Sequence, residues 1–174
     1  MKHYGIFLGR CQPFHAGHQH IIDKIISDGL EPIVILGSAQ ESRTANNPYN
    51  EFERLKMVQL VYPNVQVILL DDADCWDDWH NALLCSIQSF VTTNLDEVTI
   101  YLHDKLEDLQ DFTFRGKDYL NESYSKVYEV DGMHTTKLPI SDIQIRAKSI
   151  RADLEGNKEF LHPAVYNYIK ALND

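Results

Sequence analysis

The chain has 174 residues, of which 44% are hydrophobic and 24% charged, a balance that suits one globular domain and leaves too little for two ordinary ones. Its formal net charge of −10, from 26 acidic and 16 basic residues, disfavours nucleic acid and anionic membranes as partners, because both repel an acidic surface. No uncharged run is long enough to span a membrane, and the N-terminus lacks the pattern of a signal peptide. Three cysteines without a CxxC pair indicate a reducing compartment, so we expect a cytoplasmic protein.

Short apolar runs rich in β-branched residues predict strands at 4–8, 33–36, 65–70, 98–102 and 127–130. Helical spacing of apolar residues predicts helices at 16–28, 50–61, 78–91, 141–154 and 163–172. The least regular stretch, 104–125, is expected to be a loop-rich insertion. Strands without polar alternation, placed between helices, predict an α/β fold: a single doubly wound parallel five-stranded sheet with helices on both faces. Ligands of such sheets bind at the carboxyl ends of the strands.

The turn after the first predicted strand reads GRCQPFHAGH and ends at His18. No GxG and no GxxxxGK[ST] phosphate loop occurs in the chain. Instead, His15 and His18 flank the start of a helix, and His18 continues the apolar stripe of that helix. Gly17 leaves room for a ligand to approach the backbone, and the N–H groups of a helix N-terminus suit phosphate. A lone histidine would be read as a core or capping residue, but two at this spacing beside Arg10 favour a functional site.

The segment after the second predicted strand reads GSAQESRTANNPYNEFER. Glycine, hydroxyl and amide side chains after a strand suit a loop that contacts a ligand, although such loops are also common as plain turns. Ser38 and Asn47 lie in this loop. Arg54 lies on the next predicted helix, where the ordinary alternative is a surface ion pair that contributes little.

The loop after the third predicted strand carries five aspartates together with Trp76 and Trp79. We expect the aspartates to be solvated or to cap a helix, because Mg²⁺ in proteins mostly rides on substrate phosphates. An indole suits stacking on a flat cationic ring, and core packing is the alternative for both tryptophans. Near the C-terminus, Ser141 suits a helix cap, and Arg146 or Arg151 offers a guanidinium to phosphate oxygens unless both are exposed helix charges.

Both N-terminal blocks carry a family resemblance. GRCQPFHAGH resembles the GRFQPFHxGH signature, and GSAQESRTANNPYNEFER the GSAQxSxTxxNPFTxxER block, of nicotinamide-mononucleotide (NMN) adenylyltransferases in the HxGH nucleotidyltransferase superfamily. ISDIQIR resembles its ISxTxxR signature with Ile143 in place of threonine; the local match favours Arg146, with Arg151 close behind. The resemblance is to archaeal-type and Nudix-fused-type domains, and it implies that 1–174 form a single Rossmann-like nucleotidyltransferase domain without the Nudix domain.

The resemblance also implies roles for individual residues. The groups expected to act in catalysis, by holding ATP phosphates and stabilising charge on the bridging and departing oxygens, are His15, His18 and Arg10. Further ATP or phosphate contacts are implied for Gly9, Gly17, Ser141, Arg146 and Arg151. Nucleotide or NMN contacts are implied for Phe7, Gln12, Ser38, Asn47, Arg54 and Trp79. No side chain is expected to serve as a resident metal ligand.

The reaction implied by the resemblance joins NMN to ATP and gives NAD⁺ and pyrophosphate, by in-line attack of the NMN phosphate on the ATP α-phosphorus. Mg²⁺ is expected as a substrate-bound ion, and the resemblance is compatible with a homo-oligomer. Two alternatives stay open. The same fold transfers nucleotides to other acceptors, such as nicotinate mononucleotide or phosphopantetheine, and a non-catalytic NAD- or ATP-binding sensor would keep the same pocket. The presence of both histidines favours the enzyme.

Overall fold

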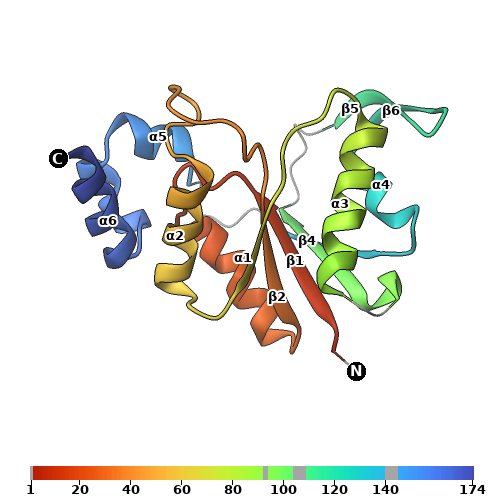
Figure 1. Cartoon of the computed structure of the whole chain (residues 1–174), viewed down its shortest axis with the longest axis horizontal. Coiled ribbons are helices and arrows are strands. Elements are labelled where there is room, and N and C mark those ends of the chain that lie inside the picture. Colours follow the sequence, from red (N-terminus) through yellow and green to blue (C-terminus); the bar gives the residue numbers. More distant parts are fainter. Residues whose placement is uncertain (1, 92–93, 104–108, 140–144) are drawn as a thin grey trace.

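A computed structural model describes residues 2–91, 94–103, 109–139 and 145–174. The main sheet consists of five parallel strands in the order β3-β2-β1-β4-β7 (Figure 1). These strands are β1 (Tyr4–Gly9), β2 (Glu31–Leu36), β3 (Gln66–Leu69), β4 (Val98–His103) and β7 (His134–Leu138). The α-helices are α1 (Ala16–Ser27), α2 (Glu51–Val61), α3 (Trp76–Phe90), α4 (Lys126–Glu129), α5 (Ala147–Ala152) and α6 (Pro163–Asn173), and short 3₁₀ turns lie at Leu95–Glu97 and Glu155–Phe160. The predicted α/β fold with a five-stranded parallel sheet is confirmed.

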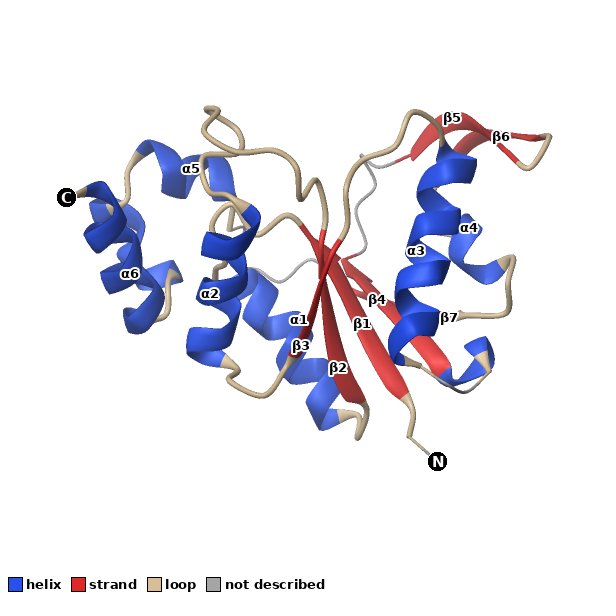
Figure 2. Ribbon diagram, viewed as in Figure 1, coloured by secondary structure: helices blue, strands red, loops and turns tan. Residues whose placement is uncertain are grey.

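Helices cover both faces of the sheet (Figure 2), with α1, α2, α5 and α6 on one side and α3 and α4 on the other. Successive residues of β1 point into different cores. Phe7 packs in the cluster that includes Ile22 of α1 and Ile169 of α6, whereas Ile6 packs in the cluster that includes Leu83 of α3. Both faces of the central strands are therefore apolar, which is why these strands show no polar alternation.

The fifth strand lies elsewhere than predicted. Residues 127–130 were expected to form it, but Val127 and Tyr128 belong to α4 and are fully buried beside α3. Among the described strands, β7 forms the edge of the sheet, where it pairs with β4 and keeps His134 and Lys137 exposed. An edge strand needs little apolar character, so its sequence carries a weak strand signal.

Two further expectations need correction. The stretch 104–125 contains a hairpin, β5 (Leu109–Phe114) and β6 (Lys117–Ser123), which forms a separate two-stranded antiparallel sheet beside α3. The helix expected at 141–154 is described only as the short α5, and residues 145 and 146 before it are not helical. Ser141 lies outside the described residues.

The order of the strands reverses at β1, whose neighbours are β2 and β4. Loops at the carboxyl ends of parallel strands diverge at such a point and leave a crevice for a ligand. This places the turn before α1, the loop before α2 and the loop before α3 along one edge of the sheet. Within the described part of the chain, no helix combines the length and apolar composition needed to cross a bilayer.

Candidate active site

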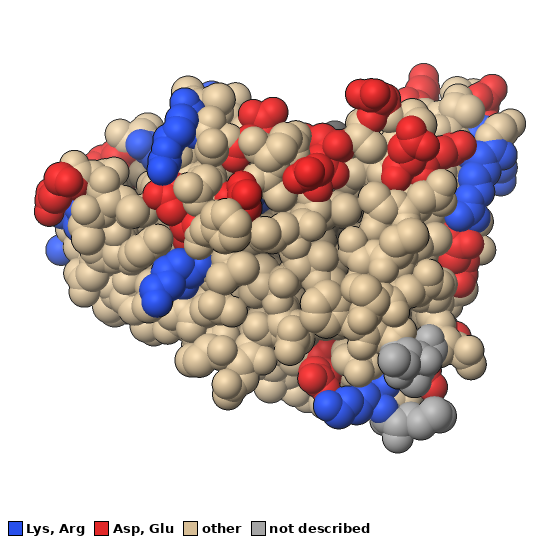
Figure 3. Space-filling view, in the orientation of Figure 1, with Lys and Arg blue, Asp and Glu red and all other residues tan. Residues whose placement is uncertain are grey.

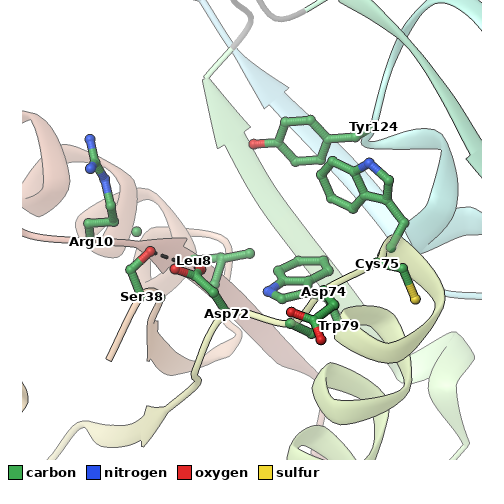
Figure 4. A pocket seen from close by; sticks show the side chains of 12 residues that line it. Leu8, Arg10, Ser38, Asp72, Asp74, Cys75, Trp79 and Tyr124 are labelled. Carbon is green, nitrogen blue, oxygen red and sulfur yellow. Dashed lines mark hydrogen bonds between the residues drawn. The ribbon is translucent and has the colours of Figure 1, made fainter. Parts of the chain in front are cut away.

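A cavity of about 600 Å³ opens at the carboxyl ends of β1 and β2. On one side it is lined by Gly9 at the end of β1, by Arg10 after it and by Ser38 after β2, and on the other by Trp79 and Tyr124 (Figure 4). Pockets of a few hundred to a thousand cubic ångströms are typical of small-molecule sites. The cavity has room for a nucleotide and combines polar groups at one end with aromatic rings at the other.

The two histidines of the HAGH turn form a reciprocal cap at the start of α1. Nδ1 of His15, the N-cap residue, accepts a hydrogen bond from the Gly17 N–H at 3.1 Å. Nδ1 of His18 accepts one from the His15 N–H, also at 3.1 Å. Histidines here do what Ser or Thr and Glu usually do in a capping box. The cap fixes both rings to the helix terminus.

This cap also selects which nitrogen carries the proton. Because Nδ1 of each ring is an acceptor, the neutral imidazoles of His15 and His18 carry their proton on Nε2. The two rings stack with centroids 3.7 Å apart, and His18 lies against Phe14 and Phe7 with centroids 5.7 and 5.4 Å away. The pair therefore forms one rigid unit able to offer two N–H donors to an anion at a helix N-terminus.

The glycines of this turn are required by ring packing. A Cβ added to Gly17 would lie 2.9 Å from Cε1 of His15, and one added to Gly9 would lie 2.6 Å from Cζ of Phe7. The space beside Gly17, interpreted from sequence as room for a ligand, is thus occupied by the His15 ring. Phe7 is buried beneath the loop, and its contact with a nucleotide stays a prediction.

Arginines gather around the β1–α1 loop. Arg151, in the last turn of α5, donates from Nη1 to the Gln12 carbonyl at 2.7 Å. Burial, and next the nearby charge of Arg10, lower the pKa of Arg151. By contrast, Arg146 is exposed at the start of α5. Guanidinium groups held close together create a local positive potential that suits a polyphosphate within an otherwise acidic protein.

Arg54 is fully buried and holds the loops of the site in place. Its Nε donates to the carbonyl of Asn50, the N-cap residue of α2. Its Nη atoms donate at 2.9–3.3 Å to the carbonyls of Arg10, Gly37, Ser38 and Ala39. All five N–H groups of the guanidinium therefore have backbone partners. Burial lowers the pKa of Arg54, which is the desolvation expected for an arginine with no carboxylate partner in these contacts.

Gln12 has a similar role between the two sequence blocks. Its Nε2 donates to the Tyr49 carbonyl at 2.9 Å, and its Oε1 accepts from the Tyr49 N–H at 3.0 Å. Arg10 makes a second connection, from Nη1 to Oδ1 of Asn47 at 3.4 Å. The side-chain amide of Gln12 is thus engaged with the backbone. Sequence reasoning missed this structural role for Gln12 and Arg54, because bonds to carbonyl groups leave no partner residue type to recognise.

Ser38 links the cavity to the loop before α3. Its hydroxyl donates to Oδ1 of Asp72 at 3.0 Å (Figure 4), and Gln40 Nε2 donates to the other carboxylate oxygen at 2.8 Å. Asp72 therefore connects the loop before α3 to the loop before α2. Among the described residues, no group of three or more His, Cys, Asp and Glu side chains is arranged to hold a metal ion.

Three aromatic residues form the opposite side of the cavity, which we call the aromatic wall: Trp76, Trp79 and Tyr124. Trp76 stacks on Tyr124 with centroids 5.4 Å apart and meets the edge of Trp79 at 5.7 Å. Both tryptophans thus pack on other aromatic rings and also face the cavity. Tyr124 was not identified from sequence, because it follows a stretch without regular pattern.

Comparison with known proteins agrees with this geometry. The sequence model of the cytidylyltransferase-like family matches residues 6–152. A protein of Halorubrum lacusprofundi named nicotinamide-nucleotide adenylyltransferase is 34% identical over 79 residues, which cover 43% of this chain and 45% of the relative. The match therefore spans less than half the length of that relative.

Solved structures share the fold. The NadR protein in complex with NAD and AMP-PNP has a TM-score of 0.69 and 21% identity, over 97% of this chain and 47% of that one. A bifunctional NMN adenylyltransferase/ADP ribose pyrophosphatase of Francisella tularensis, complexed with AMP and a manganese ion, has a TM-score of 0.69 and 17% identity, over 100% of this chain and 50% of that one.

Proposed function

Because this chain belongs to the cytidylyltransferase-like family, we propose that it is an adenylyltransferase that joins NMN to ATP and gives NAD⁺ and pyrophosphate. The observation that carries the proposal is the His15–His18 pair, held at the start of α1 by the turn that also carries Arg10 and whose Gln12 carbonyl accepts from Arg151. A relative named nicotinamide-nucleotide adenylyltransferase and a structural neighbour bound to NAD and AMP-PNP support this choice of nucleotides.

In this reaction a phosphate oxygen of NMN attacks the α-phosphorus of ATP, and the bond from that phosphorus to the bridging oxygen breaks. The electron pair leaves with pyrophosphate, so no protein base and no covalent intermediate are required. The Nε2–H groups of His15 and His18 donate to the bridging and departing oxygens as charge develops on them. Arg10 and Arg151 hold the phosphate chain in line for attack.

Divalent metal enters with the substrate. The described residues offer no cluster of three His, Cys, Asp or Glu side chains for a resident ion, whereas ATP carries its own oxygen ligands for Mg²⁺. The manganese ion belongs to the Francisella tularensis protein, and we extend divalent metal use to this chain as Mg²⁺ bound to ATP. The ion supplies charge neutralisation on the phosphates.

The pyridine ring of NMN packs against the aromatic wall, with Trp79 as its stacking partner. Asp74 lies beside Trp79 in the cavity, and Asp72 lines it next to Ser38 (Figure 4). Acidic side chains also gather along this rim of the molecule (Figure 3). Of the described residues that line the cavity, Arg10 alone carries a positive charge. An acidic setting favours the cationic nicotinamide ring and disfavours the extra carboxylate of nicotinate mononucleotide.

The contacts seen in the structure change the roles that we assign to several residues named from the sequence. We assign the triphosphate contact to Arg151 rather than Arg146, because Arg151 already reaches the β1–α1 loop. Gln12 and Arg54 act by fixing the loops that Ser38 and Asn47 belong to. Contacts of Ser38 and Asn47 with the nucleotide remain predictions, as do a homo-oligomer, a cytoplasmic location and a single domain over 1–174.

The proposal is tested by pyrophosphate release from MgATP with NMN, nicotinate mononucleotide or phosphopantetheine in parallel reactions. We expect release with NMN and at least about tenfold lower kcat/KM with nicotinate mononucleotide, a difference of about 1.4 kcal/mol. Release with phosphopantetheine alone would mean that the protein is a nucleotidyltransferase for a different acceptor. Binding of ATP or NAD⁺ without any release would identify the protein as a sensor and refute the proposal.

A further inference from the structure

The β5–β6 hairpin is an addition to the main sheet, and its position depends on α3. It forms its own two-stranded sheet, and such a hairpin is marginally stable without packing partners. Phe112 of the hairpin lies against Trp76 with ring centroids 5.8 Å apart, and Phe114 meets the buried His80 ring edge-on at 4.9 Å. The apolar contacts of the hairpin with α3 therefore lie directly beside the aromatic wall.

A cluster of polar side chains also holds the hairpin against α3. Asp131, in the loop before β7, accepts from Nε2 of the fully buried His80 at 2.7 Å and from both Nη atoms of Arg115 at 3.0 Å each. Arg115 lies in the hairpin turn, and its backbone N–H donates to Oδ1 of Asp77 at 2.9 Å. The Arg115 guanidinium holds the pKa of Asp131 below its usual range, against the opposing effect of burial. One carboxylate thus joins α3, the hairpin turn and the loop before the edge strand.

The cluster is contiguous with the wall of the cavity. His80 follows Trp79 along α3, and Asp77 follows Trp76. Tyr124, which comes directly after β6, stacks on Trp76. A shift of the hairpin relative to α3 would therefore change the packing of all three rings of the aromatic wall, whereas the phosphate end of the cavity is fixed separately by Arg54.

We propose that Asp131 is a positioning residue, which acts through His80 and Arg115 to set the aromatic wall for the pyridine ring of the acceptor nucleotide. It touches no reacting atom. The bidentate, charge-assisted pair with Arg115 suits this task because it fixes direction as well as distance. The assignment of the pyridine ring rests on the proposed function, and the placement of the wall by Asp131 is independent of it.

The decisive variant is Asp131→Asn, which turns one carboxylate oxygen into a donor facing the N–H groups of its partners. We expect the KM and Kd for NMN to rise about tenfold, with those for ATP changed less than about twofold. The matched control is Asp118→Asn, on the same hairpin: Asp118 accepts from the Thr113 hydroxyl at 2.7 Å within the hairpin itself. This control should leave both constants unchanged.

A second variant guards against a folding defect. Arg115→Gln removes the guanidinium, whose side chain is 39% exposed, and leaves the His80–Asp131 contact in place. It should weaken NMN binding in the same way. The double variant with Asp131→Asn should bind NMN no more weakly than the weaker-binding of the two single variants. Equal losses for NMN and ATP, or an unchanged NMN constant in a folded variant, would overturn the proposal.

Tryptophan fluorescence tests the positioning without any substrate. The chain has two tryptophans, Trp76 and Trp79, and both belong to the aromatic wall. Acrylamide should quench them more strongly in Asp131→Asn and Arg115→Gln than in the wild type or Asp118→Asn. Such a change supports the positioning role even if the wild type transfers no adenylyl group, whereas unchanged quenching would overturn it.

Discussion

Replacement of Arg54 by methionine should cost far more stability than an ordinary arginine substitution. Methionine fills a similar volume but supplies no donors. The carbonyls of Arg10, Gly37 and Ala39 would then lose the side-chain donor that the structure gives them, whereas the Ser38 carbonyl still accepts from the Glu41 N–H at 3.0 Å. At about 1–3 kcal/mol for each buried group left unpaired, and with water able to reach the cavity side, we expect a loss of about 3–5 kcal/mol.

Urea unfolding at pH 7, followed by far-UV circular dichroism, measures this loss directly. Arg43→Met is the matched control, because Arg43 pairs with Glu53 at 2.7 Å but its side chain is 62% exposed, so solvent screens the pair and its loss should cost much less stability than the loss of Arg54. The folded fraction of Arg54→Met should also have a reduced kcat/KM, because both loops of the site lose their common anchor. A loss below about 1 kcal/mol, or one equal to that of Arg43→Met, would refute the role given to Arg54.

Three further predictions address the chemistry and the hairpin. His18→Ala should lower kcat about 10²- to 10³-fold, a much larger effect than the stability loss of about 1 kcal/mol expected from the lost helix cap, and equal turnover would contradict its role as a donor in the transition state. Arg151→Ala should raise the KM for ATP about tenfold, while the KM of Arg146→Ala stays near the wild-type value in the same steady-state assay. A larger increase for Arg146→Ala would show that Arg146, not Arg151, contacts the triphosphate. The pKa of Asp131 is lowered in the folded state, so its stabilisation is present above about pH 4 and is lost as the pH falls through that lowered value. The difference in unfolding free energy between wild type and Asp131→Asn should therefore shrink from about 1 kcal/mol at pH 7 toward zero in acid, and a constant difference would contradict this linkage.

The parts of the fold that sequence predicts well are those buried on both faces. β1 and β2 are apolar at consecutive positions because each lies between two layers of helices, and this run of apolar residues predicted both strands. The edge strand β7 lacks this signal, since it is paired on one side and partly exposed. The buried pair Val127 and Tyr128 gave a false strand, because four residues are too few to distinguish a strand from one turn of helix.

The candidate site divides in the same way. The spacing of His15 and His18 specifies a local helix cap, so their proximity can be predicted from sequence. The partners of Arg54 are backbone carbonyls that the tertiary fold brings together. Because every residue has a carbonyl, the residue types in the sequence do not identify these partners. Tyr124 reaches the cavity through a hairpin whose position depends on packing with α3, a contact that local pattern does not encode.

The central claim is adenylyl transfer at the histidine pair, and product stoichiometry tests it most directly. The wild type is incubated with MgATP and NMN, and NAD⁺ and pyrophosphate are quantified together by chromatography, with His18→Ala as the matched variant. The account predicts one NAD⁺ for each pyrophosphate in the wild type and a rate about 10²- to 10³-fold lower in the variant. Pyrophosphate or ADP without NAD⁺, or equal rates in both proteins, would contradict it.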